Sequence, residues 1–211
     1  VSSRISLYKG LLKDGADELI NSFNAVSGQW LLDIIKAAGK PQSKANEKQL
    51  KEKQGIVAAY KFLASFFLKS DITWVPLSIA ELIRVTGNVG LKIKEADFSV
   101  RLQNKKLGAM SDDLLFVGFK AGAMYLLPLE VKTREKGNDF TKAIKQAYEL
   151  GNHMGRLLSS DSFKGQVYRS LFIQHVMSQI ERFKLYKIFP KGYFENLLNS
   201  REYYQQGTYD V

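Results

Sequence analysis

The chain has 211 residues, a formal net charge of +10 and no cysteine. Its length favours one domain, and the missing cysteines exclude disulfides, thiolate metal sites and cysteine nucleophiles. No apolar run reaches the ~18 residues that a membrane span needs, and the first residues lack the organisation of a signal peptide. We therefore expect a cytoplasmic protein with no membrane partner, and the basic charge favours nucleic acid as its partner.

Helices are predicted in the first third of the chain. Apolar side chains recur at spacings of three and four over residues 11–38, which predicts two helices. Residues 43–70 predict another helix, whose charged first half and apolar second half are typical of a helix with one buried end. We expect residues 1–40 to form a helical extension and residues 41–211 to form the main domain.

The middle of the chain is rich in strand signals. Residues 71–76 predict a short strand, and residues 78–86 predict a short helix with Ser78 as its cap. Apolar and polar residues alternate over 96–103, which predicts a further strand. Two more apolar stretches, at about 113–119 and 124–132, follow each other across a small Gly-containing turn. They predict a hairpin.

Two helices are predicted after this hairpin, at about 139–158 and 167–189. The second carries an apolar stripe formed by Phe172, Val176, Ile180 and Phe183. The last residues are polar and aromatic, and their pattern predicts no element. The order of helices, strands and helices favours an α/β fold in which a small mixed β-sheet is flanked by helices.

The charged residues of the hairpin lie at one of its ends. With the turn at residues 120–123, counting outward along both strands sets Asp113 opposite Glu130. Side chains alternate between the faces of a strand, so Glu130 and Lys132 share a face. Because directly opposed residues have Cβ atoms about 4.5–5.5 Å apart, these three groups should converge. Asp112 is the alternative to Asp113.

Two opposed carboxylates repel each other unless a cation neutralises them. Oxygen ligands on strands suit Mg²⁺ or Mn²⁺, which would hold a phosphodiester and lower the pKa of a bound water. Lys132 would then orient or deprotonate that water, or stabilise charge that develops on the phosphate. The alternative is a surface hairpin whose end is charged only because it leaves the core.

Basic residues follow this candidate site in the sequence. Arg134 would emerge at its rim, and Lys142 and Lys145 belong to the next predicted helix. We expect these three side chains to contact DNA phosphates, because backbone contacts dominate affinity for nucleic acid. Ordinary solvation of the helix is the alternative. The two histidines, His153 and His175, have no partner at metal-ligand spacing.

Two short motifs carry a resemblance to a known family. An acid precedes the first apolar strand in "SDD" at residues 111–113, and "EVK" stands at residues 130–132. The pair resembles the signature of the PD-(D/E)xK nuclease superfamily, although Asp112 replaces the proline that is usual before the first acid. The resemblance implies a restriction-endonuclease-like core and metal-dependent hydrolysis of DNA, with a 5′ phosphate and a 3′ hydroxyl as products.

The same resemblance implies a role for each site residue. Asp113, Glu130 and the backbone carbonyl of Val131 would bind Mg²⁺ or Mn²⁺, and Lys132 would position or activate water. Gln146, on the helix after the second strand, would support the site as in the RecB-like branch of the family.

The family often adds an acid on a helix before the strands, where Glu47 or Glu52 would fit. The stretch "PLSIAELIRVTGNVG" is similar to the C-terminal nuclease-like domain of DptH-type restriction proteins, which act on DNA that lacks phosphorothioate modification. This implies part of a larger defence protein. An ATPase or translocase region would lie in the same or an associated chain, because this sequence has no Gly-rich phosphate loop.

The residues also allow a function without catalysis. A catalytically inactive nuclease fold would bind DNA or a partner protein, and an assembly domain would use its basic face to meet an acidic partner. Metal-dependent DNA cleavage that is lost in Lys132→Ala and Asp113→Ala would distinguish the enzyme from both.

Overall fold

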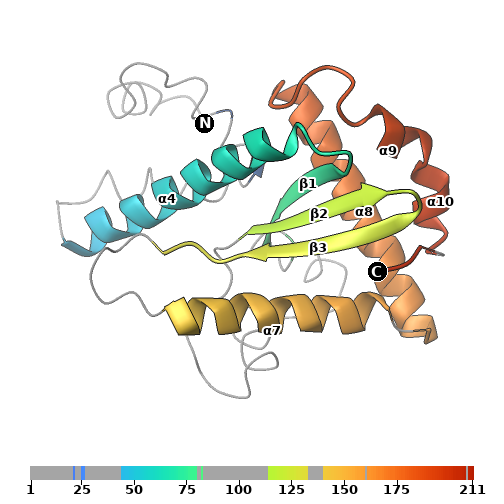
Figure 1. Cartoon of the computed structure of the whole chain (residues 1–211), viewed down its shortest axis with the longest axis horizontal. Helices are drawn as coiled ribbons and strands as arrows, with labels where there is room; N and C mark the ends of the chain where they lie inside the picture. The colour runs from blue at the N-terminus through green and yellow to red at the C-terminus, as the bar shows by residue number, and fades with distance from the viewer. Residues whose placement is uncertain are drawn as a thin grey trace, which may run out of the picture.

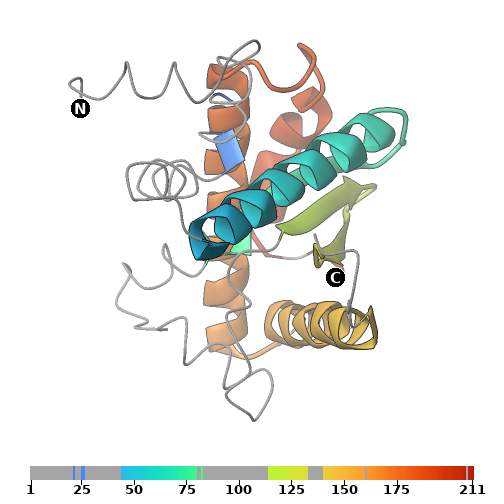
Figure 2. The same ribbon diagram turned by 90° about the vertical axis from the view of Figure 1, so that its left-hand side faces the viewer.

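The computed structural model of the chain describes residues 21, 25–26, 44–79, 82, 114–132, 140–159, 161–207 and 209–211. Within these ranges the elements are helix α4 (Lys44–Phe67), strands β1 (Thr73–Ser78), β2 (Leu114–Lys120) and β3 (Ala123–Leu129), and helices α7 (Phe140–Leu158), α8 (Phe163–Leu185), α9 (Glu195–Asn199) and α10 (Arg201–Gln205). Figures 1 and 2 show the strands between α4 and α7, with α8 across the back of the sheet. The α/β class with flanking helices is therefore confirmed.

The sheet has the strand order β1-β2-β3, and both neighbouring pairs are antiparallel. The sequence favours a mixed sheet, but the three described strands pair in antiparallel fashion. For β2 and β3 the reason is their short turn, which can join only antiparallel neighbours. Parallel pairing among the described residues is a single bridge between Ala123 and Asp210. There the Met124 amide donates to the Asp210 carbonyl at 2.8 Å, which ties the end of the chain to β3.

A two-residue turn, formed by Ala121 and Gly122, joins β2 to β3. Their φ angles are 50° and 84°, and a type I′ turn requires positive φ at both positions. The twist of such a turn matches that of the strands, so it fixes their register. The last described pair of the resulting ladder is Leu114 with Leu129. This register is the one that the sequence predicts.

The core lies on both faces of β1 and β2, the two strands that are almost entirely buried. All of β2 except its last residue is buried, as its continuous apolar run predicts for a strand covered on both faces. Gly118 permits this packing, because a Cβ there would lie 2.8 Å from Cγ2 of Ile72 and 2.9 Å from the Trp74 ring. The predicted apolar stripe of α8 is also buried, namely Phe172, Val176, Ile180 and Phe183.

Residues near both ends of the chain complete this core. Ala25 and Val26 are fully buried, and the Ala25 carbonyl accepts a hydrogen bond from the Gln179 amide on α8. Part of the predicted extension therefore packs on the main domain. Near the other end, Leu197 on α9 and Tyr204 on α10 are buried in a segment for which the sequence predicts no element.

Several predictions fall outside the described residues. They include most of the helices in residues 1–40, most of the helix at 78–86 and the strand at 96–103. Among site residues, Asp112, Asp113 and Arg134 also lie outside them. None of the helices that the structure describes is both long enough and apolar enough to cross a membrane.

Candidate functional site

The candidate site lies where β3 ends and α7 passes beneath the strands (Figure 1). Glu130 and Lys132 follow the last residue of β3, at the end of the hairpin that is opposite the turn. The register that would align Asp113 with Glu130 is confirmed as far as its last described pair, Leu114 with Leu129. Asp113 is the next residue in the sequence beyond that pair.

Three polar side chains meet at this end of the hairpin. The Lys132 ammonium forms an ion pair with Glu130 Oε1 and donates to Gln146 Oε1 over an N–O distance of 3.5 Å. The Glu130 side chain is 10% exposed and that of Lys132 is 30% exposed. Gln146 is buried. The structure thus brings together the Glu-Val-Lys motif and the glutamine of the following helix, from two elements.

Helix α7 positions Gln146 because it packs closely against β3. Gly151 permits the close approach, since a Cβ there would lie 3.3 Å from Cγ of Pro128. Leu150 and Met154 are also buried, and their spacing from Gln146 places all three on the same face of the helix. The face that anchors α7 to the sheet is therefore the face that delivers the amide to the site.

The cluster fits one part of a metal centre. A nearly buried carboxylate such as that of Glu130 is costly without a partner, and the Lys132 ammonium supplies one. Glu130 offers a hard oxygen of the kind that Mg²⁺ prefers. The described residues contain no group of three or more His, Cys, Asp or Glu side chains that could hold a metal. Further ligands would have to come from Asp113, from the Val131 carbonyl and from water.

The residues expected to contact phosphates are partly described. Lys145 lies next to Gln146 on α7, and its side chain is 75% exposed, with Nζ 3.7 Å from Glu149 Oε1. Lys142 belongs to the same helix. An exposed pair of this kind contributes little stability, so Lys145 is free to exchange Glu149 for an external anion.

The two acids proposed for the preceding helix, Glu47 and Glu52, both lie on α4. That helix packs against β1. Of the histidines, His175 is buried within α8 and His153 lies on α7.

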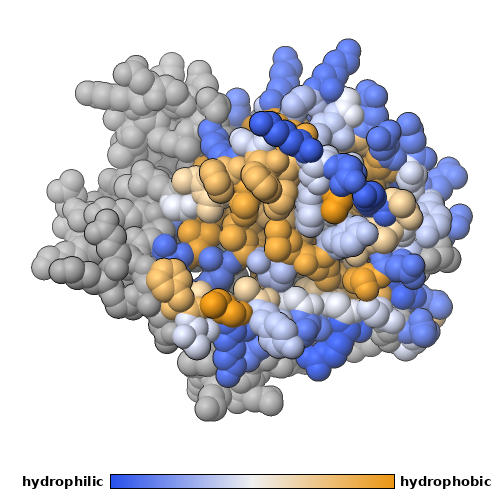
Figure 3. Space-filling model, in the orientation of Figure 1, coloured by the Kyte–Doolittle hydropathy of each residue, from blue (hydrophilic) through white to orange (hydrophobic). Residues whose placement is uncertain are grey.

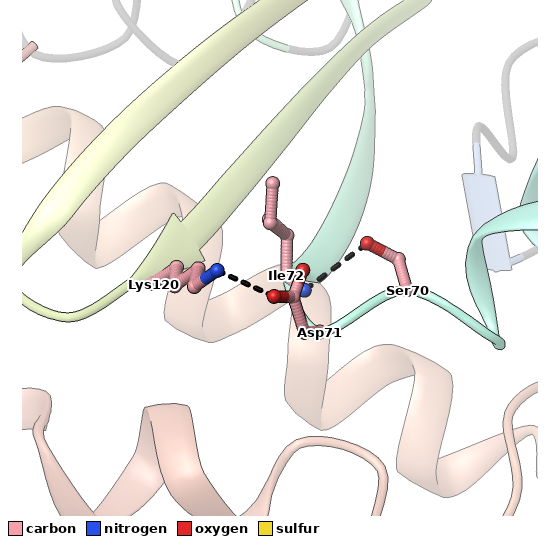
Figure 4. A network of polar contacts seen from close by, with 4 residues as sticks. All are labelled: Ser70, Asp71, Ile72 and Lys120. Carbon is pink, nitrogen blue, oxygen red and sulfur yellow. Dashed lines mark hydrogen bonds and ion pairs between the residues drawn. The ribbon is translucent and has the colours of Figure 1, made fainter.

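A second polar group lies at the turn end of the hairpin, and sequence reasoning missed it. Lys120 at the end of β2 pairs with Asp71, while the Ile72 amide donates to Ser70 Oγ at 3.1 Å (Figure 4). The hydrogen bond from Lys120 lowers the pKa of Asp71, and the same contact raises the pKa of Lys120. Asp71, Lys120 and Tyr203 line a cavity of about 520 Å³. Asp71 and Lys120 are 49 residues apart in the sequence, so no local pattern predicts their contact.

Apolar side chains gather on one face of the molecule. Figure 3 shows them over α4 and over the strands between α4 and α7. The exposed apolar residues of these elements include Phe62 and Phe66 on α4, Leu127 on β3, and Ile144 and Tyr148 on α7. Exposed apolar surface of this extent is typical of a face that contacts another molecule.

Comparisons with known proteins do not assign the chain to a family. No family model, no curated protein and no solved structure matches it. The function must therefore be argued from the side chains themselves.

Proposed function

We propose that the chain is a metal-dependent deoxyribonuclease domain of the PD-(D/E)xK type, which hydrolyses phosphodiester bonds in DNA. The observation that carries the proposal is the meeting of Glu130, Lys132 and Gln146 at one end of the hairpin. A carboxylate and an ammonium held by a hydrogen-bonded amide suit a reaction at phosphorus. The net charge of +10 favours a polyanionic substrate.

The metal site of this proposal extends the observed ladder by one pair. That extension would set Asp113 opposite Glu130, and the two carboxylates would hold Mg²⁺ or Mn²⁺ with the Val131 carbonyl. Two acids against one Lys132 ammonium leave a net negative charge, which a divalent cation would offset. When bound, the ion would polarise the phosphate and lower the pKa of the attacking water.

The other side chains act on the water and the phosphate. Lys132 would orient the attacking water or stabilise charge that develops on the phosphate. Gln146 would hold the Lys132 ammonium in place, because its amide oxygen accepts a hydrogen bond from Nζ. Arg134, Lys142 and Lys145 would contact the DNA backbone on either side of the scissile bond.

A plasmid cleavage assay with Mg²⁺ or Mn²⁺ tests this proposal, and the chain offers a matched control. Lys120 and Lys132 lie at opposite ends of the same hairpin, and each pairs with an acid. We expect Lys132→Ala to lower the metal-dependent rate by about 100-fold or more, the scale for loss of one group that stabilises a transition state. Lys120→Ala should cleave like the parent. Equal rates for the two variants would contradict the assignment.

A binding module without catalysis is the second candidate, and the exposed apolar face over α4 favours it. Such a face would dock a partner chain, such as the ATPase or translocase region of a larger restriction protein. DNA binding with no cleavage under any metal condition, in the presence of that region, would favour the module over the nuclease.

A further inference from the structure

A second cavity lies where the chain leaves α8 and approaches α9. Its volume is about 560 Å³, within the range of about 300–1,000 Å³ that small-molecule sites occupy. Most of its lining is aromatic or lysine, and none of it belongs to the proposed cleavage site. The lining includes Phe183, Lys184, Lys187, Phe189, Lys191 and Tyr193.

Stacked aromatic rings form one wall of this cavity. Phe189 and Tyr193 are stacked with ring centroids 5.0 Å apart and planes 12° from parallel. Behind them, Phe183 and Phe194 are stacked at 6.1 Å and 11°, and both are buried. The Tyr193 hydroxyl accepts a hydrogen bond from the Trp74 amide at 3.0 Å, which anchors the wall to β1. The wall is therefore apolar, flat in places and fixed to the sheet.

Lysines surround the mouth of the cavity. Lys184, Lys187 and Lys191 are exposed, and Glu195 is the acid among the lining residues. Lys184 has an acidic neighbour outside the cavity, Glu181, at 3.3 Å. Within the part of the chain that the structure describes, no ion pair neutralises Lys187 or Lys191. The charge of the mouth therefore suits an anion.

The backbone at Lys187 supplies an independent observation. Its φ is 52°, in the left-handed region where side chains other than glycine are disfavoured. The residue lies just past the end of α8, where the Ile188 amide donates to the Phe183 carbonyl at 3.1 Å. Glycine is the usual residue at this position of a helix terminus. A lysine in this strained conformation, at the mouth of a cavity, favours a role for its side chain.

We propose that this cavity binds a nucleotide, with the base against the aromatic wall and the phosphate at the lysines. The wall offers a stacking surface that suits a planar ring, and stacking of this kind tolerates any base. Lys187 and Lys191 offer ammonium groups to the phosphate, and the apolar interior accepts the base. The ligand is either a free nucleotide or the phosphorylated end of a DNA strand, since both carry a base and a phosphate.

Calorimetric titration of the full chain with deoxyadenosine 5′-monophosphate tests the proposal. We expect it to bind at least tenfold more tightly than deoxyadenosine or inorganic phosphate, because the site needs both the ring and the charge. A short 5′-phosphorylated oligonucleotide then distinguishes a strand end from a free nucleotide as the ligand. Competition with the monophosphate at equal or higher affinity assigns the site to strand ends, and weaker competition assigns it to the free nucleotide.

Two glycine substitutions make the test independent of folding. Lys187→Gly should raise the melting temperature, because it relieves the left-handed backbone, yet it should weaken nucleotide binding at least tenfold. Ala121→Gly relieves the other non-glycine residue with positive φ among those described, in the hairpin turn, and should leave binding unchanged. No binding of the monophosphate, full binding by Lys187→Gly, or preference for an acidic peptide over the nucleotide would overturn the proposal.

Discussion

The hydroxyl of Tyr60 on α4 is buried, and the residues that the structure describes offer it no hydrogen-bond partner. The ring stacks with Phe183 at a centroid distance of 6.4 Å, so the side chain contributes to the core through its ring. A buried hydroxyl without a partner loses its hydrogen bonds to water and gains none. Burial also raises the pKa of Tyr60 well above its ordinary value.

We therefore predict that Tyr60→Phe leaves the free energy of unfolding unchanged or raises it by up to about 1 kcal/mol. The folded state keeps Tyr60 neutral, so its contribution is fully present below the unfolded tyrosine pKa of about 10 and is lost as the pH rises above it. The variant should lose less stability at alkaline pH than the parent does. Urea unfolding at neutral and at alkaline pH measures both effects.

Tyr193→Phe is the control for this prediction, because the Tyr193 hydroxyl accepts from the Trp74 amide. Its removal leaves that amide without a partner and should cost about 1–3 kcal/mol at neutral pH. Equal losses of stability in Tyr193→Phe and Tyr60→Phe would mean that the Tyr60 hydroxyl has a partner.

Among the elements, the hairpin of β2 and β3 was the one that the sequence predicted best. Its two strands are apolar on both faces, and Gly122 marks the turn. Opposed residues of the two strands could therefore be assigned by counting outward from that turn. The same counting gives the candidate pair of acids. A shift by one residue would exchange the faces, so that Asp112 and not Asp113 would lie with Glu130.

Cysteine crosslinking tests this register, because the chain has no native cysteine. Directly opposed residues lie within the Cα–Cα separation of about 4.4–6.8 Å that a disulfide accepts. We predict that Asp113→Cys with Glu130→Cys forms a disulfide on mild oxidation, as seen by a shift in non-reducing electrophoresis. Asp112→Cys with Glu130→Cys should not, because these side chains point to opposite faces. A disulfide in the Asp112 variant and none in the Asp113 variant would mean that Asp112 is the acid opposite Glu130.

Short elements near the end of the chain could not be predicted in the same way. Helices α9 and α10 have five residues each, too few for a periodic pattern. Contacts with distant residues hold them in place, such as the edge-to-face packing of Tyr204 on Phe119 with centroids 4.9 Å apart. Burial of Leu197 and Tyr204 depends on the assembled sheet, so no local sequence pattern predicts it.

For the molecule as a whole, the sequence predicted the class of fold and the shared face of Glu130 and Lys132, and the family resemblance added Gln146. Periodicity was sufficient for α7 and α8, and α7 then delivers Gln146 as a consequence of its packing. The antiparallel pairing of β1 with β2 and the cavity beyond α8 were not predicted. Both depend on how distant segments meet, and the cavity also depends on the backbone at Lys187.

The net charge of +10 has a measurable consequence for binding. We predict that DNA affinity falls steeply with salt, because binding releases counterions. Lys145→Ala should lower the slope of log affinity against log salt by about 1, as loss of one phosphate contact does. Lys120→Ala removes another exposed lysine that pairs with an acid, at the turn end of the hairpin, and should not change the slope. Identical slopes for both variants would remove Lys145 from the DNA interface.

Binding of Mn²⁺, followed by the loss of the free-ion signal in electron paramagnetic resonance, tests the central claim most directly, because it does not require an ATPase partner. We predict one site in the parent chain, which is lost in Glu130→Gln and in Asp113→Asn. It should persist in Glu149→Gln, which alters an acid of α7 that pairs with Lys145. No bound Mn²⁺ in the parent, or undiminished binding in Glu130→Gln, would contradict a metal-dependent nuclease at this hairpin.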